Sequence, residues 1–273
     1  MNMPSITHGA QFTSSVNVER YDAHILDRGI STRSAAHGAV ATDPVHPQAH
    51  QLWRDSLALM KQFVPFTQRK VRANEEVYVC GKPFDTLYLI SSGLFKIVNL
   101  VPDGREQPAG FFFKGDWLGF DGIPTGSHTC SAMALDMGEL WSVRYDILLR
   151  ASVGEPQLMR LVMAAISSQL SRHRDVSLSM GTLSADARVA DFILHWALSL
   201  EERGMRTDEI DLHLSRAEIG SYLGVRSESV SRALSRLKGA GIIQFQESSH
   251  RVIRIPSFDA LRDFVQRSAE PSR

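Results

Sequence analysis

The clearest pattern of apolar and polar positions lies in residues 214–241, and it predicts two short helices joined by a tight turn. Ser215 stands three residues before Glu218, and this S-x-x-E capping box begins the first helix. Gly220 is small where a second helix must cross closely, and Gly224 is free to adopt the positive φ of a sharp turn. The pattern is typical of a helix-turn-helix.

The predicted second helix begins near Ser227, a good N-cap residue, and separates its apolar from its polar positions. Its apolar face holds Val230, which fills the space where the two helices cross, together with Ala233, Leu234 and Leu237. Its polar face carries the candidate DNA contacts Arg226, Glu228, Ser229, Ser231, Arg232, Arg236 and Lys238. Four basic residues against one acidic residue give four minus one, a local charge of plus three. Such a helix can lie in the major groove, although an ordinary helical hairpin with a solvated charged face is the alternative.

A β-rich region precedes these helices and runs to about Val143. A short amphipathic helix is expected between His50 and Phe66. Short apolar runs separated by glycines then predict strands at 77–79, 87–90, 94–98, 111–113 and 139–143. Many short strands with glycine turns favour a barrel or roll. Such a roll holds a small ligand, senses a state or serves only as a scaffold.

A long helix is predicted from Pro156 to Gly181. Its heptad-like seam, which a second copy of the helix would cover, consists of Met159, Met163, Ile166, Leu170, His173 and Ser177. The alternative is that this stripe packs on the chain's own roll. We expect dimerisation, because a helix-turn-helix normally reads its operator with two-fold symmetry.

The remaining elements complete a winged helix-turn-helix. Ser184 caps another helix, and a strand is expected at 210–214. A hairpin of 242–245 with 252–255 forms the wing, where His250 or Arg251 near the tip would contact phosphates. A short helix follows at 258–265.

Length and charge restrict the classes of function. The 273 residues predict an α+β chain with four parts: a disordered tail (1–50), a roll (51–154), a dimerisation helix (155–182) and the DNA-binding domain (183–273). Thirty basic residues balance thirty acidic ones, so DNA contact must come from a local patch. No apolar run of about 18 residues and no signal peptide are present, which favours the cytoplasm. A metal or haem site among five histidines of the tail is the alternative to disorder: His8, His24, His37, His46 and His50.

The order of roll, seam helix and winged helix-turn-helix resembles the Crp/Fnr family of bacterial transcription regulators. The resemblance covers about residues 52–265 and is carried by LYLISSGLFKI (87–97), GDWLGFDGI (115–123), SADARVADFI (184–193) and LSRAEIGSYLGVRSESVSRALSRL (214–237). GDWLGFD and the E-S-V-S-R run are closer to the Fnr branch. The resemblance implies a regulator that is not an enzyme, with double-stranded DNA, a second copy and RNA polymerase as partners, and no membrane.

The resemblance also implies which side chains read the DNA. Glu228, Ser231 and Arg232 match the Fnr-type recognition positions E-x-x-S-R, which implies a palindrome of the TTGAT-N4-ATCAA kind. The chemistry agrees, because arginine pairs with guanine O6 and N7 and glutamate accepts from cytosine N4.

The sensing region departs from the well-known branches. Two cysteines, Cys80 and Cys130, cannot supply the four thiolates of an iron–sulfur cluster within one chain. Phe120 and His128–Thr129 occupy the regions where cAMP receptors use a glutamate and an Arg-Ser pair, so a cyclic phosphate would lack its charged partner.

We therefore expect no cofactor, and three modes of regulation stay open. They are regulation by abundance alone, a thiol switch at Cys80 or Cys130 with His128 lowering a thiol pKa, and a haem or other ligand bound by histidine or cysteine. Two other classes of function are weighed as well. A cupin-like metal enzyme would need an H-x-H pair, of which His128-Thr129-Cys130 is the nearest match. A nucleotide-binding module without DNA contacts is disfavoured by the E-S-V-S-R run.

Overall fold

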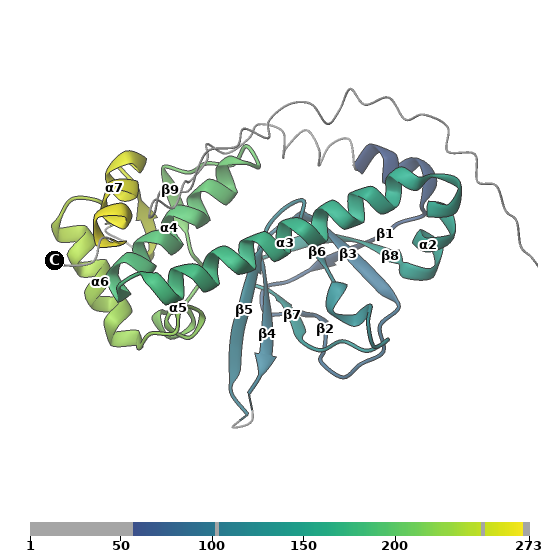
Figure 1. Cartoon of the computed structure of the whole chain (residues 1–273), viewed down its shortest axis with the longest axis horizontal. Helices are drawn as coiled ribbons and strands as arrows, with labels where there is room; N and C mark the ends of the chain where they lie inside the picture. Colours follow the sequence, from purple (N-terminus) through teal and green to yellow (C-terminus); the bar gives the residue numbers. More distant parts are fainter. Residues whose placement is uncertain (1–56, 102–103, 247–248, 270–273) are drawn as a thin grey trace, which may run out of the picture. The chain divides into compact units, whose positions relative to one another are not determined.

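The computed structural model describes residues 57–101, 104–246 and 249–269 (Figure 1). The tail predicted at 1–50, with its five histidines, lies outside these residues. Residues 57–63 are helical, which agrees with the amphipathic helix expected before Phe66. Within the described residues, no helix is both long enough and apolar enough to cross a membrane.

Two antiparallel four-stranded sheets form the roll. The first sheet has the order β1 (Thr67–Val71), β8 (Gly138–Arg144), β3 (Thr86–Ser92) and β6 (Trp117–Leu118). The second has the order β2 (Glu76–Tyr78), β7 (Ser131–Ala134), β4 (Phe95–Leu100) and β5 (Glu106–Phe112). All five predicted apolar runs fall on or overlap a strand. The strands β1, β6 and β7 escaped prediction because β1 is mostly polar, β6 has two residues and β7 alternates alanine with other residues.

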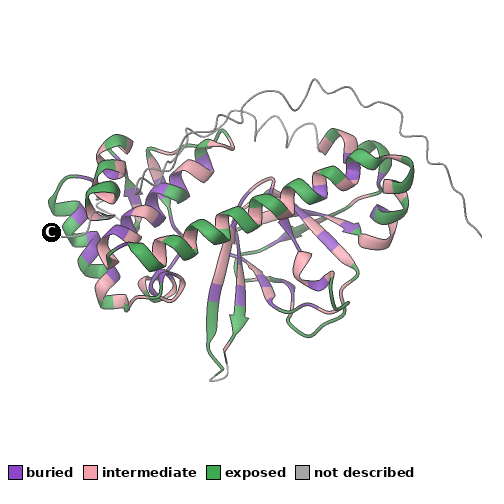
Figure 2. Cartoon of the chain, viewed as in Figure 1, coloured by how far each residue is buried: buried purple, intermediate pink, exposed green. Residues whose placement is uncertain are grey.

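Two helices follow the roll. The first, α2 (Tyr145–Gly154), was not predicted, and the second, α3 (Pro156–Thr182), has Pro156 in its first turn as expected. Gly181 does not end α3, which continues to Thr182. One face of α3 buries Leu158 and Val162 against the roll, while Figure 2 shows exposed residues along much of the helix.

The C-terminal part contains the predicted winged helix-turn-helix. Its helices are α4 (Ala185–Glu201), α5 (Arg216–Leu223), α6 (Ser227–Gly239) and α7 (Phe258–Ala269). Its sheet has the order β10 (Gln244–Gln246), β11 (Ser249–Arg254) and β9 (Glu209–Asp211). Ser184 caps α4 by accepting a hydrogen bond from the Ala187 amide, as the sequence predicted. One core joins these elements, and Leu94 and Phe113 of the roll belong to it.

Candidate nucleic-acid interface

The turn between α5 and α6 has the predicted chemistry. The Ser215 hydroxyl accepts from the Glu218 amide at 3.1 Å, and the Glu218 carboxylate accepts from the Ser215 amide at 2.9 Å. Gly220 lies against the turn, where an added Cβ would be 2.6 Å from the carbonyl oxygen of Val225. Gly224 ends α5 with φ of 65°. The capping box, the small residue and the turn glycine are therefore confirmed.

The recognition helix α6 is anchored through its apolar face. Val230, Ala233, Leu234 and Leu237 are all buried in the core that α4 and α5 share. The start of α6 differs from the prediction, because Arg226 is its N-cap residue and Ser227 is already helical. No side chain caps α6 with a hydrogen bond, and its buried apolar face is one of the contacts that hold its orientation.

The opposite face of α6 carries the candidate DNA contacts. The exposed members are Arg226, Glu228, Ser231, Arg232, Arg236 and Lys238, while Ser229 is half-buried. The guanidinium of Arg232 donates to the Ser229 hydroxyl at 3.1 Å, and the Ser231 hydroxyl donates to the Ser227 carbonyl at 3.1 Å. A face with this mixture of donors, acceptors and positive charge suits base edges and phosphates.

Arg236 has a partner within the chain that the sequence did not reveal. Its guanidinium pairs with the carboxylate of Asp186 in the first turn of α4, at 2.5 Å. The pair fastens α6 to α4, so Arg236 combines a structural role with its predicted place on the DNA-facing side. Lys238 lies in the last turn of α6, where a phosphate contact remains the prediction.

The wing is formed by β10 and β11, which pair antiparallel. Arg251 is an exposed residue of β11. The tip at 247–248 lies outside the described residues, as does the side chain of His250. The phosphate contacts predicted for His250 and Arg251 stay predictions.

The predicted dimer seam divides between two environments. Met163 and Leu170 are 55% and 70% exposed. Met159 and Ile166 are half-buried and pack against the roll of the same chain. The last two seam residues, His173 and Ser177, are exposed, and the Ser177 hydroxyl donates to the His173 carbonyl. Each of the two alternatives drawn from the sequence therefore holds for part of α3. Met159 and Ile166 pack on the chain's own roll, whereas Met163 and Leu170 lie on an exposed face.

The two cysteines differ in environment. Cys80 is exposed, and its thiol donates to the Thr129 carbonyl. Burial, together with the nearby Asp121 carboxylate, raises the pKa of the Cys130 thiol to about 12. The expected lowering of this pKa by His128 is therefore not found, and Cys130 is a poor candidate for a thiolate switch. Cys80 stays a possible redox residue.

Asp121, in the 3-10 helix η2 (Phe120–Gly122), fills the region where an effector was considered. Its carboxylate accepts from the Thr129 amide at 2.8 Å and from the Tyr78 hydroxyl at 3.2 Å. His128 is buried and stacks on Tyr78 with ring centroids 3.8 Å apart. The Thr129 amide is thus occupied by a carboxylate of the chain itself. Sequence reasoning missed Asp121 because its partner amides lie in a separate loop.

A cavity of about 480 Å³ lies between the roll, α3 and α4, and its walls include Phe111, Ile166 and Phe192. His195 of α4 is one of its polar residues. The Asp191 carboxylate, 3.1 Å from the His195 ring, raises the pKa of His195 to about 9, with a smaller contribution from Asp175 on α3.

This pKa predicts a pH-dependent contribution to the stability of α4. The interaction of protonated His195 with Asp191 stabilises the fold fully at pH values below the ordinary histidine pKa of about 6.5. This stabilisation disappears as the pH rises through the folded-state pKa of about 9. The ring is half-exposed, so solvent screening keeps the effect small. The difference in Tm between the wild type and His195→Gln should be largest at pH 6 and vanish by about pH 10. A difference that is constant over this range would contradict the assignment.

Sequence reasoning also missed three residues outside the interface that hold the DNA-binding part against the roll. Lys96, Asp116 and Arg203 join the roll to the helix-turn-helix part by hydrogen bonds between residues far apart in sequence. No local pattern marks such pairs, although a lysine inside the apolar run FKIV was an available signal that it is paired.

The fold and the exposed face of α6 define a class, a DNA-binding transcription regulator with a sensor-like roll. Comparison with known proteins agrees. Residues 68–152 match the cyclic nucleotide-binding domain family and residues 187–264 match the Crp-like helix-turn-helix domain family. The chain is 32% identical to Electron transport regulator A of Shewanella oneidensis over 65% of this chain and 71% of the relative. It is 31% identical to the transcriptional activator protein Anr of Pseudomonas protegens over 62% of this chain and 70% of that protein. The chain therefore belongs to the Crp/Fnr family.

Solved structures have the same fold. FixK2 from Bradyrhizobium japonicum is 29% identical, with a TM-score of 0.65 over 77% of this chain and all of that chain. A transcriptional regulator of the CRP/FNR family from Thermus thermophilus has a TM-score of 0.60 over 75% of this chain and all of that chain, at 16% identity. The relatives are transcription regulators, so the protein is a regulator rather than a cupin-like enzyme.

Proposed function

We propose that the protein binds as a homodimer to a palindrome of the TTGAT-N4-ATCAA kind. The observation that carries this proposal is the outward face of α6, on which Glu228, Ser231 and Arg232 are exposed together while Val230 anchors the helix from behind. Arginine and glutamate at these positions suit guanine and cytosine in the major groove. The E-x-x-S-R spacing is the one that Fnr-type regulators use.

The second copy is supported by α3. Met163 and Leu170 stand seven residues apart on an exposed face, which is the repeat of a two-stranded coiled coil. A symmetric dimer would cover these apolar side chains and present two α6 helices to successive major grooves. The same proposal gives the protein RNA polymerase as a further partner and places it in the cytoplasm. The proposal also keeps the predicted division of the chain into a tail (1–50), a roll (51–154), a dimerisation helix (155–182) and a DNA-binding domain (183–273).

Binding to labelled duplexes tests the proposal. Air-purified protein without added ligand should bind the palindrome much more tightly than a scrambled duplex of equal length, measured by fluorescence anisotropy at one salt concentration. A stoichiometry of two chains per duplex is expected. Equal affinity for both duplexes, with haem, reductant and nucleotides each tested, would exclude the proposed half-site.

A further inference from the structure

One carboxylate, that of Glu218, both caps the first helix of the helix-turn-helix and binds the roll. Its Oε2 atom accepts from the amide and the hydroxyl of Ser215, each at 2.9 Å. Its Oε1 atom is 2.7 Å from Nζ of Lys96 on β4. Burial opposes ionisation here, but the hydrogen bonds from Lys96 and Ser215 prevail and hold the pKa of Glu218 below its ordinary value. The start of α5 is therefore fastened to a strand of the roll.

The side chain of Lys96 is directed at this contact. It is only 10% exposed, which is rare for a lysine unless the charge is paired. Beside it, Phe111 of β5 packs its ring against Trp196 of α4 and Tyr222 of α5, at centroid distances of 5.3 and 4.8 Å. The aromatic contact and the ion pair hold α5 at two separate points.

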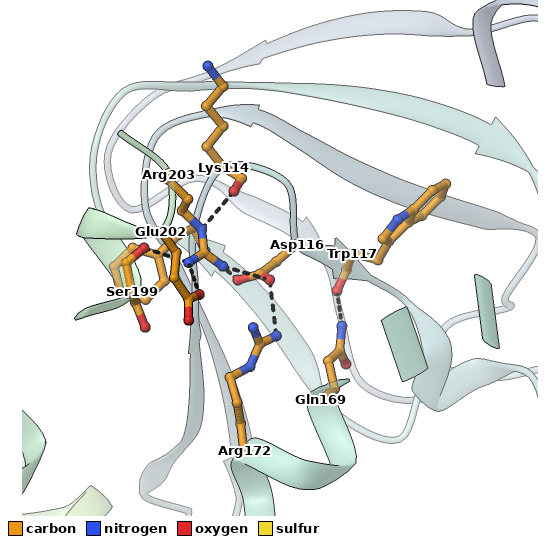
Figure 3. Close-up of polar contacts among 9 residues, drawn as sticks. Lys114, Asp116, Trp117, Gln169, Arg172, Ser199, Glu202 and Arg203 are labelled. Atoms are coloured by element: carbon orange, nitrogen blue, oxygen red, sulfur yellow. Dashed lines mark hydrogen bonds and ion pairs between the residues drawn. The ribbon is translucent and has the colours of Figure 1, made fainter. Parts of the chain in front are cut away.

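A second carboxylate, that of Asp116, joins the roll to α3 and to the end of α4. Figure 3 shows Arg172 of α3 and Arg203 reaching Asp116 from different elements, and both guanidinium groups are 3.0 Å from its Oδ1 atom. Its Oδ2 atom accepts from the Phe113 amide at 2.9 Å. Arg203 is almost buried and also donates to the Lys114 carbonyl at 2.8 Å. Asp116 is thus a common anchor for the seam helix and the DNA-binding part.

These contacts fix an angle that DNA recognition depends on. The chain passes from α3 to α4 through Leu183 and Ser184, and this short junction alone would allow rotation. In a dimer built on α3, the rotation would change the separation of the two α6 helices, which must match one turn of DNA. The roll removes this freedom by holding α5 through Lys96 and the end of α4 through Asp116.

We propose that Lys96 and Asp116 are positioning residues that set the half-site spacing read by the dimer. Both residues lie in the roll, away from the exposed face of α6. They act by fixing α5 and α4 relative to α3. The inference rests on the proposed palindrome, and it predicts that their loss relaxes the choice of spacer length while each half-site is still read by the same side chains of α6.

The first test measures spacing selectivity with the full chain. Lys96→Met removes the charge and keeps the length of the side chain, Lys96→Arg restores the charge, and Lys70→Met removes a charge from β1, away from these contacts. We expect Lys96→Met and Asp116→Asn to bind the N4 duplex about tenfold more weakly and to lose most of the preference for N4 over N3 and N5 spacers. Lys96→Arg and Lys70→Met should keep the wild-type preference.

Base-pair substitutions in the half-site and thermal melting of the variants distinguish a positioning role of Lys96 and Asp116 from a mere loss of stability. Substituting one base pair in the half-site should cost the Lys96→Met protein as much as the wild type, because α6 is unchanged. A variant that merely unfolds would lose affinity for all spacers in proportion and keep the spacing ratio. An unchanged spacing ratio in both Lys96→Met and Asp116→Asn would overturn the inference.

A second measurement does not depend on DNA. Nitroxide labels on native Cys80 and on a Ser235→Cys substitution in exposed α6 report the distance between roll and recognition helix by pulsed electron resonance, in labelled chains diluted with unlabelled ones. The wild type should give a narrow distance distribution and Lys96→Met with Asp116→Asn a broad one. The wild type could bind no palindrome while the distance distribution still broadens in the double variant. In that case the proposed half-site is wrong and the positioning role of Lys96 and Asp116 stands. Equally narrow distributions would refute the positioning role.

Discussion

Gly220→Val should abolish DNA binding and unfold the helix-turn-helix while the roll stays folded. A Cβ atom at this position meets the Val225 carbonyl at 2.6 Å and the Ser227 amide at 3.3 Å. Both obstacles are backbone atoms of the turn, so they cannot rotate away as a flexible side chain would. Overpacking of this kind costs about 3 kcal/mol. Because Val230 seats α6 in the same crossing, the recognition helix loses its orientation as well.

The matched control is Gly239→Val in the last turn of α6, where an added Cβ meets nothing within 4 Å. This variant should melt and bind like the wild type. Hydrogen exchange followed by peptide separates local from global damage. In Gly220→Val, peptides from α5 and α6 should lose protection, while those from β3 and β8 keep it. Wild-type melting and binding in Gly220→Val would show that the turn tolerates a side chain.

Arg232→Ala should remove sequence discrimination rather than DNA binding as such. Arg232 is exposed on the outward face of α6, where a bidentate contact with guanine is expected. Its loss should cost about 1–3 kcal/mol on the palindrome and little on a scrambled duplex. Substituting the base pair that Arg232 reads should then make no further difference to the variant, which identifies that position in the half-site.

Lys238→Ala is the companion variant, because Lys238 lies at the other end of the same helix. It should weaken binding to all sequences alike and reduce the slope of log affinity against log salt by about one. Anisotropy titrations at several salt concentrations distinguish the two patterns. Equal losses on palindrome and scrambled duplex for Arg232→Ala would contradict its assigned role.

Local patterns predicted the elements that are stabilised locally. The capping box at Ser215 and Glu218, the turn glycine and the plug at Val230 lie close together in the chain, so the sequence contains the whole signal. The short polar strand β1 was missed because it pairs with β8, which lies at the far end of the roll in sequence. An edge strand of this kind has no periodicity of its own to detect.

The environment of single side chains was less predictable than the elements. Cys130 was considered reactive because His128 is near in sequence, yet burial and Asp121 raise its pKa instead. Arg236 was interpreted as a DNA contact, although it also pairs with Asp186 of α4. In each case the interacting residue lies in another part of the chain. Burial and the Asp121 carboxylate reverse the expected shift in the pKa of Cys130. The Asp186 carboxylate gives Arg236 a structural role beside its expected DNA contact.

The contact between Lys96 and Glu218 also determines an order of events in folding. These residues are 122 positions apart, whereas the capping box closes over three. Short loops close faster than long ones, so α5 and α6 form early from local contacts and the lysine arrives only after the roll has assembled. We therefore expect the helix-turn-helix to form before the roll holds it, with its attachment to the roll among the last steps of folding.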